Sequence, residues 1–127
     1  METNQIILSR GIYQLVKTHI KQNNRLSESN KNQLETELKS AKVVNGKSFP
    51  DEIVGVNRSV TVRDMETDQE FKFDLVDPAK AKMKNNKLSV LSPIGLALVG
   101  YGVGSEVQWE MADGTKKYRI EEVSILK

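Results

Sequence analysis

The chain of 127 residues contains no cysteine, one histidine and three prolines. Without cysteine it has no disulfide, no thiolate metal site and no thiol nucleophile. It also lacks an apolar run near the roughly 18 residues that a membrane span needs. Its first residues, Met1–Gln5, do not have the basic start of a secretory signal. These absences lead us to expect a cytoplasmic protein, outside membranes, with one domain and a small appendage.

Aromatic residues make up only 6% of the chain, and the formal net charge is +2. A charge this small does not by itself indicate a nucleic-acid-binding protein. The charge is unevenly distributed, because residues 1–43 hold seven Lys or Arg against four Asp or Glu, whereas residues 44–127 hold twelve against thirteen. The first third of the chain is therefore basic, and the rest is close to neutral.

Apolar residues at three- and four-residue spacings predict two helices in the first third of the chain. The first is expected from about Asn4 to Gln22, and the second after a cap at Ser27 or Ser29. Two short amphipathic helices joined by a polar loop are typical of an antiparallel hairpin. We therefore predict a short helical hairpin, or short coiled coil, over residues 1–44.

Residues 59–127 show the two-residue alternation of β-strands and follow a linker over residues 45–58. Phe71, Phe73 and Trp109 are expected in the core rather than in a ligand pocket. The alternating apolar residues are Val60, Val62, Phe71, Phe73, Leu75, Val107, Trp109, Met111, Tyr118 and Ile120, and Val123 and Ile125 resume the alternation in a shifted phase. Asp113–Gly114 is typical of a tight hairpin turn, and a change of phase at Glu121–Glu122 predicts a bulge. We expect four or five mostly antiparallel strands with one helix across a face, which is an α+β fold.

The stretch Leu88–Gly104 is the most informative part of the sequence. It predicts a short strand, an apolar helix and a glycine-rich exit. Ser92 is a natural N-cap, because its hydroxyl can accept a free amide of the first helical turn. Pro93 falls at the first helical position, where a missing N–H costs nothing. A helix this short is not stable alone, so the strands on either side are expected to cover it.

Four stretches together resemble a known family: residues 37–44, the linker with Pro50, residues 59–64 and, above all, residues 91–104. They are similar to the GreA/GreB transcription elongation factors and to their relative, the regulator of nucleoside diphosphate kinase. The family pattern is close to Ser-Pro-x-x-x-Ala-Leu-x-Gly-x-x-x-Gly. It is matched here by Ser92, Pro93, Ala97, Leu98, Gly100 and Gly104.

The resemblance implies an FKBP-like C-terminal domain behind the N-terminal helical hairpin. It also implies RNA polymerase as the partner, because in this family the C-terminal domain docks on the rim of the polymerase secondary channel while the hairpin enters the channel. The family's docking surface includes the loop before the helix, which corresponds here to Leu91, Ser92 and Pro93. The cleavage factors often have a polar or acidic residue where this chain has Leu91.

The hairpin tip departs from the pattern of the cleavage-stimulating factors, whose acidic tip residues help to hold a Mg²⁺ ion in the polymerase. Here the expected tip, residues 23–30, offers only Glu28, with Arg25 nearby. The resemblance therefore implies a factor, not an enzyme, that docks without stimulating transcript cleavage and is closest to the regulator of nucleoside diphosphate kinase. We expect no cofactor, no bound metal, only indirect contact with nucleic acid, and a monomer.

Two other functions stay open at this point. An FKBP-like fold suggests a prolyl isomerase, although that activity needs an aromatic-lined pocket and fold alone does not carry function. The basic stretch Lys80–Lys87 and the cationic hairpin suggest a nucleic-acid-binding module, but the stretch lacks interleaved aromatic residues, and a solvated loop is the default interpretation.

Gly100–Gly104 follows a helix and opens a strand, the reverse of a nucleotide-binding loop. His19 is expected at the edge of the core.

Overall fold

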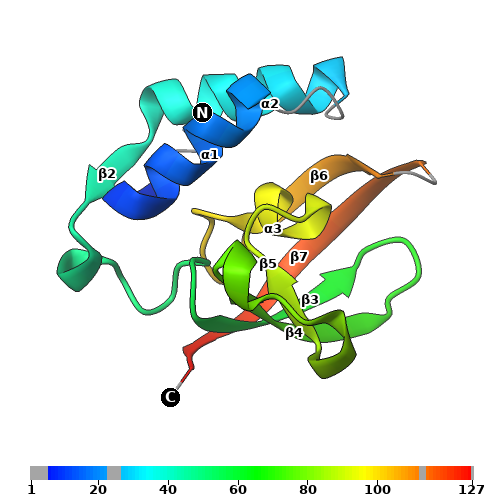
Figure 1. Ribbon diagram of the computed structural model, residues 1–127. Coiled ribbons are helices and arrows are strands. Elements are labelled where there is room, and N and C mark those ends of the chain that lie inside the picture. The colour runs from blue at the N-terminus through cyan, green and yellow to red at the C-terminus, as the bar shows by residue number, and fades with distance from the viewer. Residues whose placement is uncertain (1–5, 23–26, 112–113, 127) are drawn as a thin grey trace.

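The structure, a computed structural model, describes residues 6–22, 27–111 and 114–126 (Figure 1). Its helices are α1 (Arg10–Gln22), α2 (Glu28–Ser40) and α3 (Pro93–Leu98). Its strands are β1 (Ile7–Ser9), β2 (Lys42–Val44), β3 (Arg58–Asp64), β4 (Glu70–Val76), β5 (Lys87–Ser89), β6 (Glu106–Met111) and β7 (Gly114–Ile125). The described residues also form the 3-10 turns η1 (Gly46–Ser48), η2 (Pro78–Lys80) and η3 (Met83–Asn85). None of these helices is long and apolar enough to cross a membrane.

The larger sheet has five strands in the order β5-β4-β3-β7-β6. Neighbouring strands are antiparallel except β4 and β5, which run parallel. Because α3 lies over one face of this sheet (Figure 1), the predicted α+β architecture is confirmed. The predicted bulge is confirmed too, since Thr61 lies opposite Glu122 but Val62 lies opposite Ile120. Glu121 is therefore the extra residue on β7.

The core lies on the face of the sheet that α3 covers. Val60, Val62 and Ile120 are 0% exposed, and Trp109 is 2% exposed. The prediction that placed Phe71 in the core is wrong, because this residue is 39% exposed. It pairs with Val62 at the start of β4, directly beside the exposed turn between β3 and β4. The alternation thus predicted which face of the sheet is apolar, but not how far along β4 that face is buried.

The first helix begins later than predicted. It starts at Arg10 rather than near Asn4, which lies outside the described residues, because Ile7–Ser9 forms strand β1. This strand pairs in parallel with β2 to make a small second sheet. Ile6 and Leu8 are buried while their neighbours are half-buried, so this short stretch has a two-residue period. Four residues of such a period are too few to be distinguished from the helical spacing that follows.

The second helix begins as predicted. The Ser27 hydroxyl accepts the N–H of Asn30 at 3.1 Å, so this serine is the N-cap of α2. Strand β2 lies directly after α2 and falls inside the stretch 1–44 that was predicted to be helical. In Figure 1, α1 and α2 lie side by side above the sheet.

This N-terminal layer shares one core with the sheet. Side chains of α1 and α2 belong to the same buried cluster as the sheet residues: Ile12, Val16, Ile20 and Leu34. The approach is closest at Gly100, where a Cβ atom would lie 2.7 Å from the Cβ of Ile6. Gly100 also has a φ of 90°, a conformation that residues with a side chain rarely adopt. The glycine after α3 is therefore what allows the N-terminal layer to pack on the sheet.

Candidate partner-binding site

The stretch Leu91–Pro93, hereafter the docking loop, connects β5 to α3. The Ser92 hydroxyl accepts the N–H of Gly95 at 3.2 Å, and the proline is the first helical residue, so the predicted cap is confirmed. Upstream, the Ser89 hydroxyl accepts the N–H of Leu91 at 3.0 Å, and the Ser89 carbonyl accepts the N–H of Ser92 at 2.9 Å. A second serine, which sequence reasoning did not single out, thus fixes the docking loop from its other side.

The docking loop presents an exposed proline on a packed base. Pro93 is exposed, whereas Leu91 and Ile94 are half-buried and pack against the core. A Cβ atom on Gly95 would lie 2.6 Å from the carbonyl oxygen of Val90, so the first turn of α3 directly touches the chain that leaves β5. A surface that is already fixed in this way loses little conformational freedom on binding. The role of the docking loop in binding stays a prediction.

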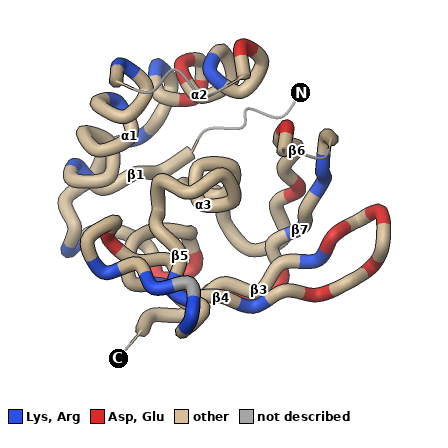
Figure 2. Tube along the Cα trace, turned by 45° about the vertical axis from the view of Figure 1, so that its right-hand side comes forward, with Lys and Arg blue, Asp and Glu red and all other residues tan. Residues whose placement is uncertain are grey.

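A basic stretch, residues 78–87, lies beside β5 and is hereafter the lysine segment. It carries Lys80, Lys82, Lys84 and Lys87 and no acidic residue, and all four lysines are exposed. Instead of a plain loop, the structure has the turns η2 and η3, closed by two backbone hydrogen bonds between Lys82 and Lys87 at 2.8 and 3.0 Å. Figure 2 shows these lysines gathered below β5.

The stretch that joins β3 to β4, residues 64–70, is hereafter the acidic turn. It contains four carboxylate side chains and no basic residue, and it projects from the sheet in Figure 2. Asp64 is only 5% exposed, and its Oδ1 accepts the N–H of Glu66 at 2.9 Å and the N–H of Thr67 at 3.3 Å. This carboxylate therefore holds the turn closed from inside.

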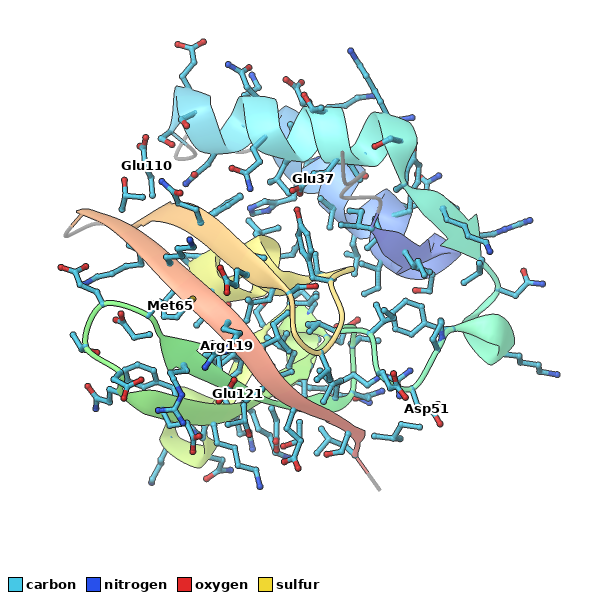
Figure 3. All side chains as sticks on the ribbon, turned by 180° about the vertical axis from the view of Figure 1, so that it is seen from behind. Glu37, Asp51, Met65, Glu110, Arg119 and Glu121 are labelled. Carbon is cyan, nitrogen blue, oxygen red and sulfur yellow. The ribbon has the colours of Figure 1, made fainter. Side chains whose placement is uncertain are left out.

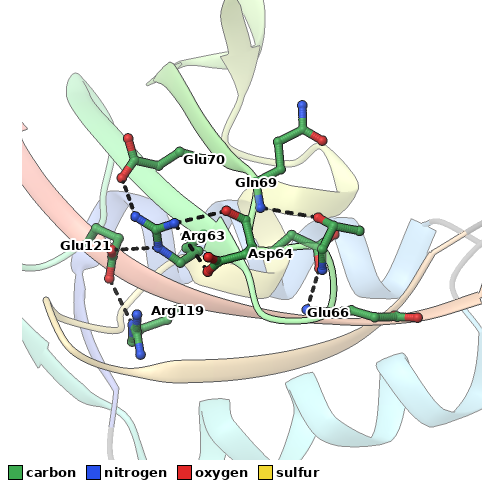
Figure 4. Close-up of polar contacts among 9 residues, drawn as sticks. Arg63, Asp64, Glu66, Gln69, Glu70, Arg119 and Glu121 are labelled. Atoms are coloured by element: carbon green, nitrogen blue, oxygen red, sulfur yellow. Dashed lines mark hydrogen bonds and ion pairs between the residues drawn. The ribbon is translucent and has the colours of Figure 1, made fainter.

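Arg63 is the centre of a charge cluster at the base of the acidic turn (Figure 4). Its guanidinium donates to carboxylates of Asp68 at 3.3 Å, Glu70 at 2.9 Å and Glu121 at 3.1 Å. Arg119 also donates to Glu121, at 2.9 Å. The hydrogen bonds from Arg119 and Arg63 lower the pKa of Glu121. Sequence reasoning missed this cluster, and its only signal is the cross-strand pairing of Arg63 with Glu70 in the predicted hairpin.

Polar side chains of α2 close the sheet edge that β6 forms. Asn30 donates to the carbonyl of Glu110 at 2.9 Å and accepts the N–H of the same residue at 3.1 Å. Gln33 donates to the carbonyl of Gln108 at 3.4 Å. Figure 3 shows Glu110 on β6 beneath α2. Such backbone groups stay unpaired on an open edge strand, so α2 protects β6 from pairing with another chain.

Glu37 lies on the same side of α2 and accepts the O–H of Tyr101. Burial raises the pKa of Glu37, and burial together with this hydrogen bond raises the pKa of Tyr101. Asn30, Gln33 and Glu37 follow each other at three- and four-residue spacing and so form one polar stripe. Sequence reasoning missed this stripe, because polar residues on a helix predict a solvated face.

The described residues contain no group of three or more side chains that would hold a metal ion. Of the predicted hairpin tip, residues 23–26 lie outside the described residues, and Glu28 is exposed in the first turn of α2. His19 is half-buried on α1, as predicted, and burial lowers its pKa.

Comparison with known proteins supports a single family. Residues 50–125 match the family described as transcription elongation factor, GreA/GreB, C-term. The transcription elongation factor GreA of Clostridium botulinum is 41% identical over 92 residues, which cover 72% of this chain and 58% of that protein. The chain therefore spans little more than half the length of the curated relatives it matches.

Solved structures share the fold. A prokaryotic transcription elongation factor GreA/GreB from Nitrosomonas europaea is 30% identical, has a TM-score of 0.68, and covers 96% of this chain and 99% of its own. The Gfh1 protein of Thermus aquaticus is 19% identical with a TM-score of 0.53, over 96% of this chain and 99% of its own, and this likeness shows the fold alone. The match to the first structure includes the N-terminal helices as well as the sheet.

Proposed function

Because this chain belongs to the GreA/GreB family of transcription elongation factors, we propose that it binds RNA polymerase and regulates transcription without stimulating transcript cleavage. It docks at the rim of the secondary channel through Leu91, Ser92 and Pro93. The observation that carries this proposal is the capped, proline-started helix α3, whose first turn is fixed by Ser92 and Ser89 and exposes Pro93. In this proposal the protein acts in the cytoplasm as a monomer and competes with longer factors for the same rim.

Two observations support the absence of cleavage stimulation. Helices α1 and α2 have 13 residues each, which gives arms of only about 20 Å at 1.5 Å per residue. Residues 23–26, between them, are Asn-Asn-Arg-Leu and supply no carboxylate. A protein-bound Mg²⁺ ion usually has one or two carboxylates together with further oxygen ligands, and residues 23–30 supply the single carboxylate Glu28, beside the cation Arg25. These arms would neither reach far into a channel nor hold a metal there.

We also propose that the five-stranded sheet with α3 is an FKBP-like domain without prolyl isomerase activity. An isomerase site needs accessible aromatic side chains around a pocket. Here Phe73 is 4% exposed, Trp109 2% and Tyr118 9%, so these rings are committed to the core. A peptide isomerisation assay is a direct check, and we expect no rate above the uncatalysed one.

Competition for RNA polymerase tests the docking proposal. A labelled GreA-type cleavage factor is bound to polymerase, and the full chain is added up to saturation. We expect displacement by the wild type and roughly fivefold weaker competition by Pro93→Ala, which corresponds to about 1 kcal/mol. Pro50→Ala is the matched control, because Pro50 is also exposed but lies in the linker. Failure of the wild type to displace the factor at saturation would refute docking at the shared rim.

A transcript-cleavage assay on stalled elongation complexes tests the second half of the proposal. We expect no cleavage above the intrinsic rate from this chain, with a GreA-type factor as the positive control. In a mixture of both, the chain should inhibit cleavage by the control factor. Faster cleavage with this chain alone would contradict the proposal.

A further inference from the structure

We propose that the lysine segment, residues 78–87, is the electrostatic half of the polymerase-binding surface and contacts an acidic protein surface next to the site of the docking loop. This inference rests on the proposed function, because it names what a second part of the same interface recognises. The charge of the segment is one-sided: it has four lysines among ten residues and no Asp or Glu. All four lysines are exposed.

The lysines are not neutralised by the described part of the protein. Ion pairs with described carboxylates are formed by Arg63, Lys117 and Arg119, and none involves a lysine of the segment. The nearest acidic neighbour in sequence, Asp77, uses its Oδ1 to accept the N–H of Ala79 at 3.0 Å and so caps η2. Four ammonium groups close together repel one another, and an acidic partner would remove that repulsion.

The backbone of the lysine segment is held in place. Besides the two bonds between Lys82 and Lys87, the Asn85 N–H donates to the Lys82 carbonyl at 2.9 Å. The Asn86 side chain donates to the Lys72 carbonyl of β4. A charged surface on a fixed backbone loses less conformational entropy on binding than a disordered tail with the same charge. The lysine segment is therefore organised for a specific surface rather than for diffuse attraction.

The lysine segment continues the surface of the docking loop. Strands β4 and β5 are parallel, so η2 and the docking loop leave the sheet at the same end. The Val90 N–H, just before the docking loop, donates to the Val76 carbonyl, just before η2, at 2.9 Å. The far end of the segment, Lys87, is the first residue of β5, and the three residues 88–90 that separate it from the docking loop span about 10 Å. This distance slightly exceeds the Debye length of about 8 Å at physiological salt, so the effect of these exposed charges on a partner of the docking loop should be strongest at low salt.

A protein surface fits this segment better than a nucleic acid. Residues 78–87 contain no aromatic side chain and no arginine. Single-stranded nucleic acids are bound through aromatic stacking and arginine, and phosphate is best matched by the arginine fork. Lysines at the edge of an apolar contact are instead suited to steering an acidic partner and to setting its orientation. The acidic turn at the other end of β4 makes the domain dipolar (Figure 2) and would disfavour the reversed orientation.

Binding of the full chain to purified RNA polymerase tests this inference. Lys80, Lys82, Lys84 and Lys87 are changed together to Gln, and the control changes two exposed lysines outside both the segment and the N-terminal hairpin to Gln: Lys47 and Lys117. By fluorescence anisotropy at low salt, we expect the segment variant to bind about tenfold more weakly and with a shallower salt dependence. The control variant should stay within about twofold. Thermal unfolding should show that both variants fold like the wild type.

The outcomes separate this inference from the proposal on which it rests. If the wild type does not bind polymerase at all, the proposed function fails. If Pro93→Ala weakens binding but the segment variant binds like the wild type, or if both lysine variants weaken it equally, the inference is overturned and the docking proposal stands. Salt-dependent binding of a single-stranded RNA 20-mer that the segment variant loses, with its polymerase affinity unchanged, would assign the lysine segment to nucleic acid and also overturn the inference.

Discussion

Two charged segments flank strand β4 and use their charges differently. The acidic turn before it has four carboxylate residues, and the lysine segment after it has four lysines. In the acidic turn, Asp64 caps backbone amides while Asp68 and Glu70 pair with Arg63. In the lysine segment, no lysine forms an ion pair with another described residue. Three of the four carboxylates of the acidic turn therefore take part in contacts that stabilise the fold, whereas in the proposal above the lysines keep their charge for a partner.

The two segments differ in the contacts of their side chains, whereas both backbones are held in place by similar features. Each contains one residue other than glycine at positive φ, Asp68 at 64° and Asn86 at 59°. Each is also closed by backbone hydrogen bonds, for example from the Asp68 N–H to the Asp64 carbonyl at 2.7 Å. Similar turns can thus be stabilised from within or left with free charge, and only the contacts of their side chains distinguish them.

The largest expected loss of stability comes from disrupting the close packing between the first turn of α3 and the chain that leaves β5. In Gly95→Ala, the new Cβ atom would lie 2.6 Å from the Val90 carbonyl oxygen and 2.8 Å from that of Ser89. Because these are backbone atoms, the strand exit must move, and we expect a loss of about 3 kcal/mol in the free energy of unfolding. Chemical denaturation measures this loss directly.

Gly11→Ala is the control for this substitution. Gly11 lies in α1, and no atom beyond its immediate surroundings in the helix lies within 4 Å of the place that a Cβ would take. Alanine there should stabilise the protein by about 0.5 kcal/mol, because glycine loses more conformational freedom on folding than alanine does. Equal effects of the two substitutions would show that α3 and the chain that leaves β5 are not tightly packed.

The next largest effect is a difference in stability between substitutions in the acidic turn and in the lysine segment. Asp64→Ala leaves the N–H groups of Glu66 and Thr67 without their acceptor, and we expect a loss of about 1.5 kcal/mol. Asp64→Asn keeps an oxygen at this position and should lose less. Lys84→Ala, an exposed change in the lysine segment, should stay within about 0.5 kcal/mol. Urea denaturation of the three variants checks the comparison, and a Lys84→Ala loss as large as that of Asp64→Ala would contradict it.

The smallest effect concerns pH. Since Arg119 and Arg63 lower the pKa of Glu121 below its ordinary value of 4.5, the unfolded state takes up this proton first as the pH falls. The contribution of Glu121 to stability is therefore complete above pH 4.5 and is lost as the pH falls through the folded pKa. Arg119→Gln or Arg63→Gln should flatten this part of the stability profile.

Thermal unfolding between neutral pH and about pH 3 measures the profile. Glu66→Gln serves as the control, because Glu66 is exposed and forms no ion pair among the described residues. An acid profile that is unchanged in both arginine variants would show that the cluster around Glu121 does not form in solution.

Sequence reasoning succeeded where the signal is local. The cap at Ser92 and the proline after it depend on a few adjacent residues, and the bulge at Glu121 follows from a phase change within one strand. It failed where two distant stretches decide the outcome. Strand β1 exists only because Lys42–Val44 lies beside it, and Phe71 is exposed because the covering layer ends before it.

The sequence by itself determined the elements of this protein: where most helices and strands lie, which strand face is apolar, and which family motif starts α3. Periodicity and caps are enough for that, because they act over a single turn or strand pair. Only the tertiary structure decided which polar residues are used up in contacts and which remain free. Asn30 and Glu37 are bound to partners 80 and 64 residues away, while the lysine side chains of residues 78–87 have no ion-pair partner among the described residues. Long-range pairing of this kind leaves no mark on the local pattern.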